Sequence, residues 1–267
     1  LPLGAFSNGT CVAFSGVIHG NGHSIKGLKI NNTNSGGYKN AGLFCSLKDA
    51  IVENLVIDSS CSFTGYYAGA LSVSVNGSLT VTNTTNKAAV NGTGTAGGFI
   101  GIMGEVKQPS VISFEDCVND GNTTARISES GGFVGAIYVN TAVTMTISNS
   151  INNGKIDGGL NTGGFVGQIA SNTNMIMTIS NSTNNGIVSG YNNRAGGLVG
   201  CVSSNTQMIL TISNSTNNGS VTGTAQYAGG LVGFFYSDTN MTTTISDSKN
   251  NGIAHGFMFV GGFVGYI

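Results

Sequence analysis

The chain is poor in charge, has only two prolines and has no tryptophan. Asp, Glu, Lys and Arg make up 8% of its 267 residues, against roughly 25% in ordinary globular domains. The net charge of −1 gives no broad field that would attract nucleic acid or an anionic membrane. The basic residues are scattered along the chain and do not form a stripe, so we expect no nucleic-acid partner.

Long apolar runs are absent as well. No stretch approaches the roughly 20 residues that a membrane span requires, so we expect no span in this segment. Residues 1–4 lack a charged leader and a long apolar stretch, and no signal peptide is visible. Hydrophobic residues nevertheless make up 40% of the chain, enough to build a core, which argues against disorder.

The five cysteines show no CxxC spacing, which makes a zinc site improbable. A disulfide among Cys11, Cys45 and Cys61 is expected in an oxidising compartment, and the spacing does not choose the pair. Cys117 and Cys201 are interpreted as small buried residues. Nothing else in the sequence indicates a metal or cofactor, and we expect neither.

A glycine-rich motif recurs along the chain. Its copies are AGLFC (41–45), GGFIG (97–101), GGFVG (131–135 and 163–167), GGLVG (196–200 and 229–233) and GGFVG (261–265). From residue 98 onward its second residue returns every 32–34 positions. A second tract, Ile-Ser-Asn-Ser followed by Asn-Asn-Gly, keeps the same period. Two motifs in phase indicate a repeat protein in which each unit stacks on its neighbours.

Each repeat contains three short apolar or alternating pieces separated by turn residues, which favours strands over helices. We therefore predict an all-β fold, a parallel β-helix (β-solenoid) with coils of about 33 residues. Residues 1–80 have shorter intervals and are expected to form atypical N-terminal capping coils, since terminal repeats shield an open edge. Residues 81–267 are expected to form the regular repeats of one continuous domain that continues past 267.

Stacking should place equivalent side chains in columns. Ile147, Ile179, Ile212 and Ile245 are predicted to form one inward column, flanked by columns that contain Met145 and Phe133. The Asn-Asn-Gly tracts are predicted to form corners with left-handed backbone, where side-chain amides would satisfy buried polar groups as ladders. The predicted ladder residues at these corners are Asn153, Asn185, Asn218 and Asn251.

The glycine motif resembles the GLUG motif. The opening FSGVIHGNGHSIKGLKI, followed by AGLFCSL and IVENLVI, is similar to the start of GLUG-type and pectin-lyase-like β-helix surface proteins. The resemblance covers nearly the whole chain, although Cys45 replaces the final glycine of the first motif. It implies a parallel β-helix of a large secreted or cell-surface protein, such as an adhesin or a protease passenger region, and no shared chemistry.

Ten Asn-x-Ser/Thr sequons are candidate N-glycosylation sites if the protein is secreted in a eukaryote. A chain this rich in Asn, Ser and Thr also produces sequons by chance. The ten are Asn8, Asn31, Asn76, Asn83, Asn91, Asn122, Asn181, Asn214, Asn218 and Asn240.

Catalytic chemistry finds little support. The one acidic group is Glu105, Glu115, Asp116 and Asp120; Asp116 and Asp120 occupy positions held by Asn in other repeats, so they are interpreted as ladder variants and the group is not expected to bind Ca²⁺. His19 and His23 lack a third partner, and His255 occupies an outward position. We predict no catalytic residue and expect that the chain is not an enzyme.

The sequence thus favours an extracellular structural or cell-surface glycoprotein that forms a rod or fibre. Its partners would be further copies of itself, further repeats of the same chain, or glycans. An adhesin-like module that binds carbohydrate through its tyrosines is the first alternative. A polysaccharide-degrading β-helix enzyme is the second.

Overall fold

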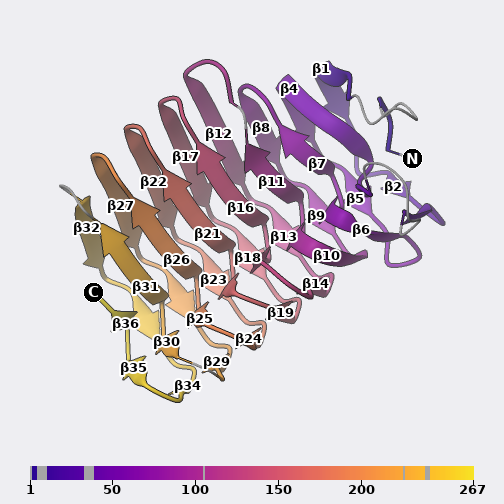
Figure 1. Cartoon of the computed structure of the whole chain (residues 1–267). Helices are drawn as coiled ribbons and strands as arrows, with labels where there is room; N and C mark the ends of the chain where they lie inside the picture. Colours follow the sequence, from indigo (N-terminus) through magenta and orange to yellow (C-terminus); the bar gives the residue numbers. More distant parts are fainter. Residues whose placement is uncertain (1, 5–10, 33–38, 105, 225, 238–240) are drawn as a thin grey trace.

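The computed structural model describes residues 2–4, 11–32, 39–104, 106–224, 226–237 and 241–267. Over these residues the chain contains strands and no helix, and therefore no helix that is long and apolar enough to cross a membrane. It winds as stacked coils along one axis, with the two ends of the chain at opposite ends of the stack (Figure 1). Every strand pairing is parallel. The predicted parallel β-solenoid is confirmed.

The largest sheet has 15 strands and two arms that join at β4 (Phe44–Glu53), which also pairs with β1 (Ala13–His19). One arm contains β8 (Leu79–Thr82), β12 (Ser110–Glu115), β17 (Val143–Ser148), β22 (Met175–Ser180), β27 (Met208–Ser213) and β32 (Met241–Ser246). The other contains β7 (Ser72–Val75), β11 (Ile100–Gly104), β16 (Val134–Val139), β21 (Val166–Ser171), β26 (Val199–Ser204), β31 (Val232–Ser237) and β36 (Val264–Tyr266).

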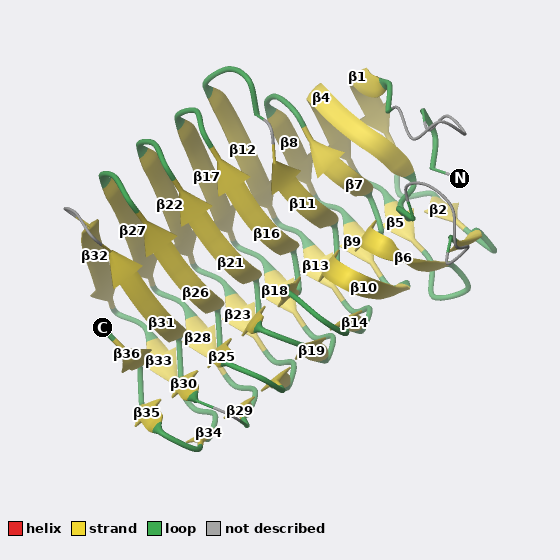
Figure 2. Ribbon diagram, in the orientation of Figure 1, coloured by secondary structure: helices red, strands yellow, loops and turns green. Residues whose placement is uncertain are grey.

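A second sheet has 13 strands, in two series that meet at β10 (Figure 2). The first series is β3 (Lys29–Asn31), β6 (Ser62–Gly69), β10 (Ala89–Gly97), β14 (Thr123–Ala125), β19 (Ile156–Gly158), β24 (Val188–Gly190), β29 (Val221–Gly223) and β34 (Ala254–Gly256). The second is β15 (Ser130–Gly131), β20 (Asn161–Gly163), β25 (Arg194–Gly196), β30 (Tyr227–Gly229) and β35 (Phe259–Gly261).

The third sheet has eight strands of two residues each. They are β2 (Ser24–Ile25), β5 (Val56–Ile57), β9 (Thr85–Asn86), β13 (Val118–Asn119), β18 (Ile151–Asn152), β23 (Thr183–Asn184), β28 (Thr216–Asn217) and β33 (Lys249–Asn250).

A regular coil therefore has five strands, as in β17 to β21, whereas the sequence predicted three pieces. The glycine motif, expected to form one apolar strand, is a bend between two strands, β20 and β21 in this coil. Strands of two or three residues are too short to show an alternation of polar and apolar residues. Only the pairing between coils reveals them.

The core lies between the two arms of the largest sheet. Ile147, Ile179 and Ile212 are fully buried and in register with one another and with Ile245. Phe99, Phe133 and Phe165 are also fully buried, with successive ring centroids 5.0 and 4.9 Å apart. A stack of equivalent coils can repeat this close packing from one coil to the next.

The left-handed backbone of the regular coils lies one turn earlier than predicted. It falls on the Asn of Ser-Asn-Ser and its equivalents, not on Asn-Asn-Gly. The φ angles are 50° at Asn149, 49° at Asn181 and 47° at Asn214. Asn and Asp adopt this conformation at lower cost than other non-glycine residues.

The Asn-Asn-Gly tracts form two ladders of asparagine along the coils, and only one of them is buried. The predicted residues Asn153, Asn185, Asn218 and Asn251 are hydrogen-bonded from coil to coil at 2.8–2.9 Å, but they are exposed. The buried ladder is the preceding asparagine of each tract, as in Asn152. Its bonds between successive coils are 2.7–2.8 Å long, and its members are Asn86, Asn119, Asn152, Asn184, Asn217 and Asn250.

The two repeat motifs touch each other in the folded coil. A Cβ at Gly164 would lie 2.1 Å from the backbone oxygen of Gly197 and 2.6 Å from the side-chain carbon of Asn184. Neither contact is sterically possible, so the bend requires glycine. The double glycine and the buried asparagine therefore share one period because they pack against each other.

Candidate functional site

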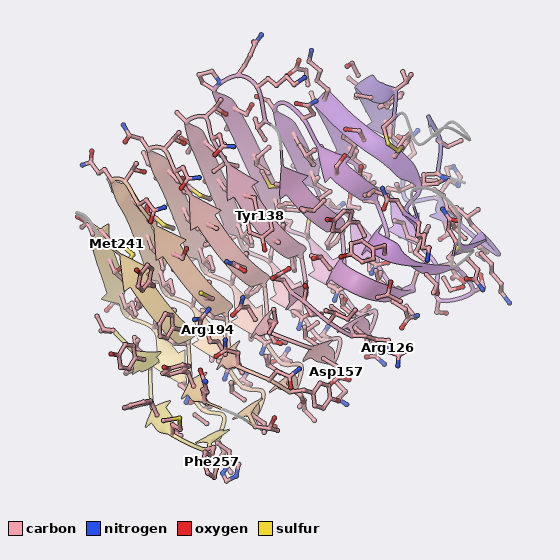
Figure 3. All side chains as sticks on the ribbon, in the orientation of Figure 1. Arg126, Tyr138, Asp157, Arg194, Met241 and Phe257 are labelled. Atoms are coloured by element: carbon pink, nitrogen blue, oxygen red, sulfur yellow. A yellow bond between two sulfur atoms is a disulfide. The ribbon has the colours of Figure 1, made fainter. Side chains whose placement is uncertain are left out.

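At each double glycine the outer surface of the solenoid turns inward. Side chains that flank the bend on the outside contact each other. Asn161 Nδ2 donates to Gln168 Oε1 at 2.8 Å, and the ring centroids of Tyr227 and Phe234 are 4.8 Å apart. We call this concave surface the elbow. Arg194, which is labelled in Figure 3, lies on it.

Two columns of outward residues line the elbow. The first precedes the double glycines and consists of Tyr67, Thr95, Glu129, Asn161, Arg194, Tyr227 and Phe259. The second follows them and consists of Ile102, Ala136, Gln168, Cys201, Phe234 and Tyr266. Several columns elsewhere repeat one residue, such as Thr146, Thr178, Thr211 and Thr244. In the elbow the residue type changes in every coil, so this surface is not used for uniform stacking.

The first half of the elbow is polar. Glu129 is only 5% exposed, and Thr95 Oγ1 donates to its Oε2 at 2.9 Å. The Tyr138 hydroxyl donates to Gln168 Oε1 at 3.2 Å. Burial, together with the Glu129 carboxylate, raises the pKa of Tyr138 well above the usual range of a phenol. Burial, neighbouring Tyr66 and then Glu129 raise the pKa of Tyr67. Both hydroxyls therefore stay protonated at neutral pH.

The second half of the elbow is aromatic around one cation. The Arg194 guanidinium carbon lies 4.1 Å from the centroid of Phe234, a cation–π contact. Its Nη1 also donates to Asn161 Oδ1 at 3.3 Å. Tyr227 stacks on Phe259, and Phe234 stacks on Tyr266, with interplanar angles of 10° and 7°. Among the described residues Arg194 has no carboxylate partner.

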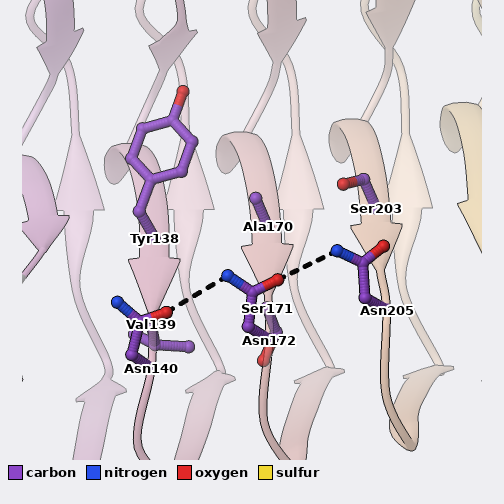
Figure 4. A pocket seen from close by; sticks show the side chains of 8 residues that line it. All are labelled: Tyr138, Val139, Asn140, Ala170, Ser171, Asn172, Ser203 and Asn205. Atoms are coloured by element: carbon purple, nitrogen blue, oxygen red, sulfur yellow. Dashed lines mark hydrogen bonds between the residues drawn. The ribbon is translucent and has the colours of Figure 1, made fainter.

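A small hollow adjoins the polar half of the elbow, on the outer face of β16, β21 and β26. Its volume is about 170 Å³, roughly the space of five or six water molecules. Ala170 and Ser203 keep it open because they follow Tyr138 in register and are small. Figure 4 shows the Tyr138 ring almost face-on beside Ala170. A row of amides, Asn140, Asn172 and Asn205, lies along it, with bonds of 3.2 and 3.0 Å.

The cysteines divide into one bridge and three free thiols. Cys11 and Cys45 form a disulfide, and Cys61 is a buried free cysteine. Cys117 and Cys201 are buried as well, and burial raises the pKa of their thiols to about 12 and about 11. Thiols of this kind remain protonated and are poor nucleophiles at neutral pH.

Most sequon asparagines that the structure describes lie on the surface. Asn31, Asn83, Asn91, Asn122, Asn181, Asn214 and Asn218 are exposed. Asn76 is half-buried. Asn8 and Asn240 lie outside the described residues. Asn83, Asn181 and Asn214 occupy the left-handed turn, and Asn218 belongs to the exposed ladder.

The other residues weighed for chemistry are dispersed. Asp120 accepts from Asn153 in the exposed ladder, and Asp116 occupies the left-handed turn. Glu115 is exposed, and Glu105 lies outside the described residues. His19 Nδ1 lies 2.5 Å from Glu53 Oε1. Within the described part of the chain, no three His, Cys, Asp or Glu side chains gather as a metal site would require.

The sequence did not single out Glu129, Gln168 or Arg194. A signal was present, because the residue two positions before each double glycine changes class from copy to copy while the two glycines do not. The tyrosines proposed as sugar contacts are partly brought together: Tyr67, Tyr138, Tyr227 and Tyr266 lie in or beside the elbow. Tyr38 lies outside the described residues.

Comparison with known proteins adds little to this geometry. The chain matches no family model and no curated protein. A solved structure that resembles it is that of a Bacteroides ovatus protein described as a "putative immunoglobulin A1 protease". The likeness covers 91% of this chain and 68% of that one, with 17% sequence identity and a TM-score of 0.47.

Proposed function

We propose that this protein is a structural scaffold of the extracellular space or cell surface, a rigid β-solenoid rod without catalytic activity. The observation that carries the proposal is that the repeated residues make the contacts between successive coils. Backbone pairing, the apolar columns, the buried asparagines and the exposed asparagines all run from coil to coil. Regularity of this kind builds stiffness along one axis and leaves few positions free for chemistry.

The extracellular location is supported by the disulfide and by the exposed sequons. Cys11 and Cys45 are bridged, and disulfides persist mainly in oxidising compartments. Seven sequon asparagines are exposed, which leaves room for glycans, and a glycan on Asn218 would replace its bond to Asn185. A sugar coat would also supply the hydration that a surface with so few charges lacks.

Further copies or further repeats are the proposed partners at the C-terminal face. Phe263 is 47% exposed there, although its equivalents Phe133 and Phe165 are fully buried. Ile253 and Phe257 on the same coil are 75% and 82% exposed. Apolar columns and unpaired strand edges of this type favour pairing with another coil.

The scaffold is tested on the intact protein made in a secreting eukaryotic host. We expect elongated particles in negative-stain images and a loss of mass after N-glycosidase treatment. Phe263→Lys should reduce concentration-dependent growth of the particles, whereas Val111→Lys, an exposed change on the side of β12, should not. Compact particles at all concentrations would contradict the rod, and an unchanged mass would contradict the glycans.

A second candidate function, binding of a carbohydrate or protein partner as an adhesin module, is favoured by the elbow and its hollow. The residue type in both columns of the elbow changes from coil to coil. A glycan array is the direct test: reproducible hits that disappear on substitution of elbow residues would support binding. An array without hits would count against it and leave the scaffold proposal intact.

A further inference from the structure

The starting point is a buried carboxylate without a counter-ion. Glu129 is 5% exposed, and among the described residues no Lys, Arg or His lies within ion-pair distance of it. Acidic side chains are rarely this buried unless they are paired, because an uncompensated buried charge is costly. The surroundings of Glu129 therefore fit a cation that binds from outside.

The groups around this carboxylate are neutral hydroxyls and amides. Thr95 Oγ1 bonds to Glu129 Oε2. Gln168 Oε1 lies in the next coil and accepts from both Tyr138 and Asn161. Burial is the first cause of the raised pKa values of Tyr67 and Tyr138, and Glu129 contributes to both. One negative charge is thus set among hydroxyl and amide oxygens.

This set suits an ammonium group better than a metal ion. A calcium site uses six to eight oxygens, several of them from carboxylates, and within the described residues no acidic cluster stands here. A primary ammonium carries three donors and one charge. One carboxylate and two or three neutral oxygens match it, and phenol rings at its side add cation–π attraction.

The hollow beside Tyr138 indicates what carries the ammonium. Gln168 and Ala170 are two residues apart on β21, so the hollow over Ala170 and Ser203 lies beside the polar half of the elbow along this strand. Asn172 and Asn205 each spend one N–H on the amide row and keep a second N–H for a ligand. A pyranose ring presents hydroxyls to such amides and a C–H face to a tyrosine.

We propose that the elbow at Glu129 and the adjoining hollow form a binding site for an amino sugar, with the ammonium at Glu129 and the sugar ring beside Tyr138. This proposal rests on the second candidate function, since it names the ligand class of the same surface. A basic peptide would supply the same ammonium group, but it would leave the hydroxyl-sized hollow and its amide row unused.

The test is calorimetric titration of the purified whole chain with three probes: the glucosamine trimer, the N-acetylglucosamine trimer and trilysine. We expect binding of the glucosamine trimer and weaker binding of the other two. Glu129→Gln should weaken it by about 10- to 100-fold, the range for a lost hydrogen bond to a charged group. Glu115→Gln, which removes one charge from an exposed site, is the matched control and should bind like the parent.

Thermal melting checks that both variants are folded, and Tyr138→Phe provides a milder change that should weaken binding only a few-fold. No binding to the parent chain, or equal binding to Glu129→Gln, would overturn the proposal. Equal binding of the acetylated trimer would show that the ammonium group is not recognised. Equal binding of trilysine would show that the sugar is not recognised. Array hits without amino sugars would sink this inference and leave the second candidate function standing.

Discussion

At the scale of single residues, the buried asparagine is the most constrained side chain of the coil. Asn184 is fully buried, accepts from Asn152 at 2.7 Å, and donates to Asn217 Oδ1 at 2.7 Å and to the Gly186 carbonyl at 2.9 Å. Both the oxygen and the nitrogen of the Asn184 amide are therefore hydrogen-bonded. Exposed Asn185 makes the same bond between coils, but water can replace its partners.

Asn184→Ala should destabilise the protein by about 1–3 kcal/mol, because it strands a buried donor and buried acceptors. The measurement is the shift in the thermal midpoint followed by circular dichroism. Asn185→Ala is the control, with an expected effect within about 0.5 kcal/mol, as for surface substitutions. Equal shifts for the two variants would show that burial of the ladder does not matter.

At the scale of the element, the double-glycine bend decides the shape of the coil. It converts what would be one strand into β20 and β21 and so creates the elbow. The bend is tight enough that backbone of the next coil occupies the space of a side chain at Gly164. The strands and the elbow therefore depend on the double glycine. The glycines are evident in the sequence, but the geometry of the bend does not follow from it.

Gly164→Ala should lower the thermal midpoint strongly, because its Cβ would lie 2.1 Å from the Gly197 oxygen and the backbone must shift. Overpacking of this kind costs about 1–3 kcal/mol and occasionally more. Gly104→Ala is the matched control, since a Cβ there meets nothing within 4 Å. A midpoint unaffected by Gly164→Ala would mean that the bend is looser than the structure shows.

The strands and turns of the coil also show which features can be predicted from the sequence and which cannot. The column of Ile147, Ile179 and Ile212 was predictable because a period of about 33 residues leaves one register for stacking. The left-handed turn was placed at the wrong asparagine because both asparagine tracts favour that conformation equally. The contact of Gln168 with Asn161 was not predictable, since it requires knowing that the bend is concave on its outer side.

At the scale of the whole molecule, the regular coils share one strand register. Thr178 is in register with Thr211, and Ile179 with Ile212. Each coil pairs only with the coils before and after it, so stability is close to a sum over coils and their interfaces. A coil removed in register should leave a complete fold.

Deletion of residues 179–211 joins Thr178 to Ile212 and removes one coil in register. We expect a folded, shorter β-protein with a sheet-type circular dichroism spectrum and a cooperative melt. Deletion of residues 179–208 is the control: it breaks the register, places polar residues in the core and should unfold the adjoining coils. Equal behaviour of the two deletions would show that register does not govern the fold.

The two asparagine ladders of the Asn-Asn-Gly tracts run in opposite senses. In the buried ladder each amide donates to the following coil, as Asn152 does to Asn184, whereas in the exposed ladder Asn185 donates back to Asn153. Each ladder therefore has a direction, with an amide donor at one end and an amide acceptor at the other. Two copies that met at their C-terminal faces would oppose donor to donor in the buried ladder and acceptor to acceptor in the exposed one, so a coil that extends these ladders must enter in one direction.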